Sequence, residues 1–147
     1  MSIKVTVDVK LEAEELINIV QNSTKVGTAA VLAGAEKGAE LVRQGIDTGR
    51  PEWQELSPIT IERKGHDQIL FDTGEMYDSI NAESVGDNQA IYYTDDPKAP
   101  IHELGLLEGG TPSIPRRAMF EPTIKGTELQ EIVDTVTEIM SKFYGGH

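Results

Sequence analysis

The strongest constraint on the fold is a helical repeat of apolar residues near the C-terminus. Between residues 129 and 143, apolar side chains recur every three or four positions, the spacing that places them on one face of an α-helix. They are Leu129, Ile132, Val133, Val136, Ile139, Met140 and Phe143. A helix with one apolar face packs that face against another element, so we expect this helix to cover part of the core.

The N-terminal residues follow a period of two instead. The apolar positions are Ile3, Val5, Val7, Val9 and Leu11, separated by polar residues. This alternation is typical of a half-buried strand. A helix is expected over 13–20 and a second, longer one over 27–45. Gly34 and Gly38 lie on the apolar face of the second helix. Because each glycine costs about 1 kcal/mol relative to alanine inside a helix, the two predict close backbone packing.

The middle of the chain alternates short strands with long loops. Residues 80–85 and 90–94 predict two strands, joined by a turn at Gly86-Asp87-Asn88. Residues 51–68 are interpreted as a loop, and so is a later segment that holds Gly105, Gly109, Gly110, Pro112 and Pro115 and runs to Arg116. We therefore expect a single α+β domain over residues 1–147. In it a small antiparallel sheet packs against long N-terminal and C-terminal helices, and the long loops form interfaces.

Composition excludes several classes of function. The chain has 147 residues and no cysteine, which excludes disulfides, thiolate zinc sites and thiol catalysis. Its net charge is −12, and residues 72–108 hold nine acids against one base, Lys98. Such a surface repels nucleic acid and anionic membranes. The acids are interpreted either as a solvated, solubilising face or as the contact surface for a protein partner that carries basic residues. No segment approaches the ~20 apolar residues of a membrane helix. We expect no cofactor.

The triplet Asp72-Thr73-Gly74 allows two interpretations. In a homodimeric aspartic protease of the retroviral type, two such aspartates share one proton. The triplet also suits a helix start, with Asp72 as N-cap and Glu75 three residues later, where a carboxylate favours the helix N-terminus. Met76 and Ile80 follow at helical spacing. We therefore interpret residues 72–75 as a structural cap and expect no enzymatic activity.

The histidines do not predict a metal site. His102-Glu103 begins like the zinc-binding H-E-x-x-H motif, but the position of its second histidine holds Leu106. His66, His102 and His147 are far apart in sequence.

Four short segments between residues 50 and 123 stand out from the rest of the chain. The first holds Trp53, Leu56, Pro58, Thr60 and Lys64. The second holds Ile69, Leu70, Thr73, Gly74, Met76 and Ser79. The third is Ile101-His102-Glu103 with Gly105, and the fourth holds Ile114, Pro115, Arg116, Arg117 and Phe120. In their order and spacing, these four segments resemble the virion morphogenesis or tail completion family of tailed bacteriophages, and the resemblance covers residues 50–123. The chain departs from the family pattern in the spacing of Arg117-Ala118-Met119 and in having Pro100 before Ile101.

The resemblance implies a non-enzymatic structural protein of the virion, located at the head–tail junction, or neck, and in the host cytoplasm during assembly. It implies a homo-oligomeric ring of six copies that contacts neck, connector and tail proteins, with no direct binding to nucleic acid. A tail terminator ring is the nearest alternative. The aspartic protease using Asp72 and a small adaptor of host origin remain open.

Seven residues are expected at interfaces of such a ring. They are Trp53, Leu56, His102, Glu103, Arg116, Arg117 and Phe120. Trp53 is expected either on the core or, as we favour, docked on a neighbour. The two arginines follow a proline that stiffens the backbone, and their guanidinium groups suit carboxylates. We expect them to pair with carboxylates of a neighbouring chain.

Overall fold

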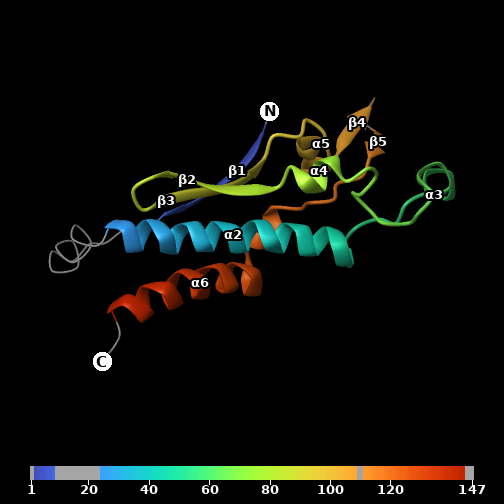
Figure 1. The fold of residues 1–147 in the computed structure, drawn as a ribbon. Coiled ribbons are helices and arrows are strands. Elements are labelled where there is room, and N and C mark those ends of the chain that lie inside the picture. The colour runs from blue at the N-terminus through green and yellow to red at the C-terminus, as the bar shows by residue number, and fades with distance from the viewer. Residues whose placement is uncertain (1, 9–23, 109–110, 145–147) are drawn as a thin grey trace.

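The computed structural model describes residues 2–8, 24–108 and 111–144, and its body has three layers (Figure 1). Helix α2 (Thr24–Thr48) lies in the middle, with a sheet on one side and helix α6 (Gly126–Tyr144) on the other. The sheet contains β1 (Ile3–Asp8), β2 (Asn81–Gly86) and β3 (Gln89–Thr94). The fold is α+β, as expected from the sequence.

The sheet is antiparallel, with strand order β1-β3-β2. In its register, Tyr92 of β3 faces Val5 of β1 on one side and Ala82 of β2 on the other. The strands predicted at 80–85 and 90–94 are thereby confirmed, as is the strand at the N-terminus over residues 3–8. The helix predicted at 13–20 lies outside the described residues, and so do Val9 and Leu11 at the end of the predicted strand.

Smaller elements gather toward the C-terminal end of α2 (Figure 1). They are α3 (Pro58–Lys64), α4 (Glu75–Asp78), α5 (Ala99–Leu104), β4 (Leu106–Glu108), β5 (Thr111–Ile114) and the 3-10 helix η1 (Glu121–Ile124). Helix α3 and the β4–β5 hairpin lie in segments that we interpreted as loops. The start of α3 has a local signal, because Pro58 follows Ser57, whose Oγ accepts from the Thr60 N–H at 3.3 Å.

The two glycines of α2 lie where neighbouring elements come closest. A Cβ at Gly34 would stand 2.5 Å from Val136 Cγ2 on α6, and one at Gly38 would stand 2.5 Å from the ring of Tyr92. Real Cβ contacts are never this short, so only glycine admits α6 and Tyr92 at these distances. The predicted close packing is confirmed. The helix is longer than expected, because it begins at Thr24 and ends at Thr48.

Tyr92 connects the sheet to η1 through the core. Its side chain is fully buried, its hydroxyl shares a 2.7 Å hydrogen bond with Thr123 Oγ1, and its ring stacks on Phe120. Burial raises the pKa of Tyr92. The core therefore continues from the sheet past the edge of α2 toward the segment before α6.

The apolar face of α6 is only partly covered by α2. Ile132 is buried, whereas Leu129, Val133 and Phe143 remain exposed. The predicted helix over 129–143 is confirmed. No helix within the described ranges is long and apolar enough to cross a membrane.

Candidate functional site

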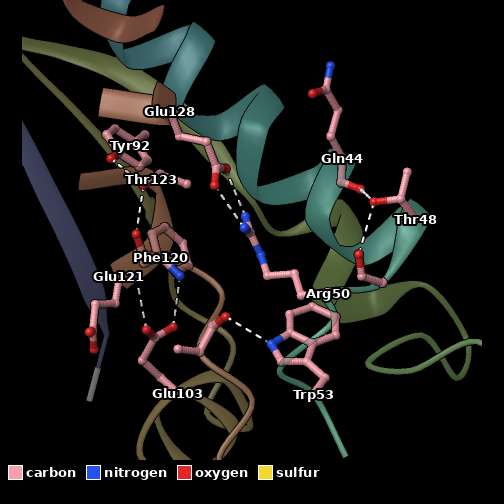
Figure 2. A network of polar contacts seen from close by, with 12 residues as sticks. Gln44, Thr48, Arg50, Trp53, Tyr92, Glu103, Phe120, Glu121, Thr123 and Glu128 are labelled. Atoms are coloured by element: carbon pink, nitrogen blue, oxygen red, sulfur yellow. Dashed lines mark hydrogen bonds and ion pairs between the residues drawn. The ribbon is translucent and has the colours of Figure 1, made fainter. Parts of the chain in front are cut away.

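Glu103 of α5 organises the segment that precedes α6. Its buried carboxylate accepts hydrogen bonds from the backbone N–H groups of Met119, Phe120 and Glu121 at 2.8, 2.9 and 3.1 Å. Figure 2 shows Glu103 below Phe120 and Glu121. These donors stand at the start of η1, where N–H groups lack partners within the helix. Glu103 thus acts inside its own chain, as a cap for a distant segment, and not at an interface.

Trp53 also packs within its own chain. Its side chain is 5% exposed, and Nε1 donates to the Ala118 carbonyl at 3.1 Å (Figure 2). Of the two positions considered for this residue, the core is correct and docking on a neighbour is wrong. Phe120 is buried in the same core cluster, where its ring stacks on Tyr92.

An ion pair connects the end of α2 to the start of α6. Arg50 Nη1 and Nη2 donate to the two carboxylate oxygens of Glu128 at 2.8 and 2.9 Å (Figure 2). The hydrogen bond to Glu128 raises the pKa of Arg50, although burial opposes it. The two residues are 78 positions apart, so no local sequence signal predicts the pair.

Arg117 does not present its guanidinium to a neighbour as expected. The side chain is 6% exposed, and Nε and Nη2 donate to the Gln54 carbonyl at 2.9 and 2.6 Å. No carboxylate forms an ion pair with it within the described part of the chain. Burial lowers the pKa of Arg117. Among the described residues, its charge is therefore balanced by the carbonyl dipoles of Gln54 and Glu55.

Arg116 is exposed and pairs within the chain as well. Its Nε donates to the Glu103 carbonyl at 3.1 Å and its Nη2 bonds to Glu121, which also pairs with Lys125. Glu121 lies outside the acidic run at 72–108. The expected pairing of Arg116 with a neighbouring chain remains a proposal, because half of this side chain is open to solvent.

The four segments that carry the family resemblance surround one cleft, which we call the α3 cleft. Its volume is about 650 Å³, and its walls come from residues 54–57, 70–76, 114 and 115 together with α3 and α5. Three expected interface residues line it, namely Leu56, His102 and Arg117. All four residues of the expected cap, Asp72, Thr73, Gly74 and Glu75, line it too.

Asp72 is not the helix cap that the sequence suggested. The N-cap of α4 is Gly74, with φ of 91°, and no side chain makes a capping hydrogen bond there. The left-handed turn at Gly74 moves the helix start two residues past Asp72, so its carboxylate is exposed in the cleft wall. The segment after Gly74 is helical, unlike the extended strand that follows the aspartate in retroviral-type proteases.

His102 presents an unused polar atom at the cleft. Its Nδ1 is buried and has no hydrogen-bond partner among the described residues. Burial lowers the pKa of His102, and the positive charge of Arg117 acts in the same direction. The ring is therefore neutral at pH 7.

The α3 cleft offers binding groups of two kinds. Leu56, Leu70, Phe71, Met76 and Ile114 are apolar, and the bases Arg63, Lys64, Lys98 and Arg117 stand among them. No group of three or more histidine, aspartate or glutamate side chains suited to a metal ion occurs in the described ranges. Comparisons with known protein families, curated proteins and solved structures found no match for this chain.

Proposed function

We propose that this chain is a non-enzymatic structural protein of a tailed-bacteriophage virion that works at the head–tail junction. In this proposal it completes or connects the tail as a homo-oligomeric ring, assembled in the host cytoplasm. The ring contacts neighbouring neck, connector and tail proteins.

One observation carries the proposal beyond the resemblance itself. The four resembling segments span residues 53 to 120, yet all four contribute to the walls of the α3 cleft. Trp53, Glu103 and Phe120 lie behind those walls and hold the segments in place through buried contacts. The residues of the resemblance thus lie around one open cleft, and such an arrangement supports a role in binding another protein.

The same end of the molecule leaves large apolar side chains in water. Leu104 of α5 is 71% exposed and Leu107 of β4 is 66% exposed, and Ile59 on α3 is open to a similar extent. Apolar side chains gathered at one end of a domain favour contact with another protein. This supports an assembly role over that of an isolated monomer.

Deletion of the gene tests the role at the junction. In the cell that produces the virus, loss of this protein should leave filled heads and separate tails in electron micrographs of lysates. Complementation with the wild-type gene should restore joined particles. Joined, infectious virions at normal yield from the deletion strain would overturn the proposal.

Negative-stain images of the purified protein test the ring separately. Class averages should show closed rings, and mass photometry should give a single multiple of the 16.1 kDa subunit mass. If no closed rings are observed, the ring is excluded from the proposal. The deletion experiment still tests whether the protein acts at the head–tail junction.

A further inference from the structure

We infer that the α3 cleft of one copy receives the turn of the β2–β3 hairpin of the next copy, joining copies head to tail. We call residues 83–88 the hairpin tip. The inference rests on the proposed ring and specifies which surfaces make it.

The α3 cleft carries positive charge in a strongly acidic chain. Four bases and three acids line it, whereas the whole chain has 13 bases and 25 acids. Arg63 and Arg117 have no ion pair among the described residues, and Arg117 is buried. Arg117 is held by backbone carbonyls, and no carboxylate of the described residues neutralises either guanidinium. Because guanidinium groups form strong charge-assisted hydrogen bonds with carboxylates, the cleft suits a carboxylate from outside the chain.

The hairpin tip combines an apolar side chain with two carboxylates. Val85 is 47% exposed, and Glu83 and Asp87 beside it are also exposed. The strand register shifts between Ser84 and Gly86, so Val85 stands at an irregularity that turns it away from the regular pleat. Within the described residues, the Glu83 carboxylate accepts a hydrogen bond only from the Tyr93 hydroxyl, at a long 3.4 Å. The tip therefore offers the two kinds of group that the cleft accepts.

Helices α3, α4 and α5, which contribute to the cleft, lie toward the C-terminal end of α2, and the turn between β2 and β3 lies toward its N-terminal end (Figure 1). At the tip, the Asn88 N–H donates to Thr28 Oγ1 at 3.0 Å, near the start of the helix. Near the cleft, Gln68 Nε2 donates to the Ile46 carbonyl at 3.5 Å, near its end. At 1.5 Å per residue, positions 28 and 46 are about 27 Å apart along the helix.

This separation determines the kind of assembly. A tip held on α2 cannot reach the cleft of its own chain, so it can only bind the cleft of another copy. Such a contact joins two different patches, and it gives a closed ring where the rotation from one copy to the next closes after a whole number of copies. The cleft volume of about 650 Å³ also falls within the range of about 300–1,000 Å³ typical of pockets that hold a ligand.

A charge swap tests the contact. The tip variant is Glu83→Lys with Asp87→Lys, and the cleft variant is Arg63→Glu with Lys98→Glu. Each variant should remain folded by circular dichroism but run as a monomer in size-exclusion chromatography with light scattering. The variant that carries all four changes in one chain should assemble again, because the swapped charges attract.

A matched control separates this contact from a general charge effect. Glu36→Lys with Glu131→Lys changes the net charge as much as the tip variant does, at exposed positions outside the tip and the cleft. This control should assemble like the wild type. Assembly by the tip variant, or a monomeric four-fold variant, overturns the inference and leaves the proposed ring standing. A monomeric wild type overturns the inference too, and the deletion experiment then decides the proposed function independently.

Discussion

At the residue scale, two buried charges hold the end of the molecule that contains the cleft. Glu103 is balanced by three backbone N–H groups, and Arg117 by the carbonyls of Gln54 and Glu55. Charged groups bond more strongly than neutral ones, and a buried partner left without its bond costs about 1–3 kcal/mol. These residues therefore fix the shape of the cleft from behind, while the exposed groups around them are free to bind.

Replacing Glu103 with glutamine tests this role. The glutamine amide turns an N–H donor toward backbone N–H donors, so at least one bond to the start of η1 is lost. We expect Glu103→Gln to lower the free energy of unfolding by about 1–3 kcal/mol, measured by urea titration. Glu75→Gln is the matched control, because its carboxylate is largely exposed, and its change should stay within about 0.5 kcal/mol. Equal effects of the two changes would contradict the role of Glu103.

His102 makes the stability depend on pH. Burial lowers the pKa of His102. The positive charges of Arg117, Lys98 and Lys64 lower it further, whereas the negative charge of Asp96 raises it. The folded state then binds fewer protons than the unfolded state between its lowered pKa and the ordinary value of about 6.5. Stability contributed by the neutral ring is therefore present above this window and falls as the pH falls through it.

The variant His102→Gln should remove that dependence. Urea titrations above and below about pH 6.5 should show a larger loss of stability on acidification for the wild type than for the variant. His66→Gln serves as the control and leaves the His102 contribution in place. If the wild type and His102→Gln lost the same amount of stability on acidification, the His102 imidazole would not be held neutral by the fold.

At the element scale, α2 can serve as the middle layer because its small residues admit neighbours on both sides. Gly38→Ala tests this packing. Alanine favours a helix over glycine by about 1 kcal/mol, but its Cβ would stand 2.5 Å from the Tyr92 ring. Overpacking typically costs about 1–3 kcal/mol. We expect the clash to prevail and the melting temperature to fall.

The exposed substitution Glu36→Ala on the same helix gives the matched control. It changes helix propensity without meeting another element, so its melting temperature should stay near that of the wild type. A stabilised Gly38→Ala protein would mean that Tyr92 moves aside easily and that the layers are looser than the structure indicates.

The elements that could be predicted are those in which one face is buried. Alternation in β1 and the turn at Asp87-Asn88 each follow from local sequence, and the helical stripe of α6 does too. Helix α3 was missed because it has no buried residue, and so no periodic pattern. The β4–β5 hairpin was missed because glycines and prolines on either side of it favour a loop.

The residues of the candidate site could be predicted, but their roles could not. The sequence pointed to Trp53, Glu103, Arg117 and Asp72, and the structure brings all four to the walls of the cleft or directly behind them. Whether a side chain faces solvent or its own core depends on contacts between positions far apart in sequence. The bond from Arg117 to Gln54 spans 63 residues. For the same reason the cleft itself and the Arg50–Glu128 pair have no sequence signature.

At the scale of the whole molecule, two electrostatic effects act on assembly in opposite directions. Each copy carries a net charge of −12, so copies repel one another through solvent. The proposed contact of the hairpin tip with the α3 cleft attracts, but only across a few ångströms in a partly enclosed site. Salt screens exposed charges beyond a Debye length of about 10 Å at 0.1 M, and it screens a partly buried pair much less.

Self-association should therefore be strongest at intermediate salt. Raising sodium chloride from very low concentration to about 0.1 M first removes the long-range repulsion, and raising it toward about 1 M, where the Debye length is about 3 Å, weakens the contact itself. Sedimentation velocity across this range should show the assembled fraction rise and then fall, with the melting curve of the subunit little changed. The control with Glu36→Lys and Glu131→Lys has four fewer net negative charges, so its maximum should lie at lower salt. Assembly that only strengthens up to 1 M would instead indicate an apolar contact, with the exposed leucines Leu104 and Leu107 as its nearest source.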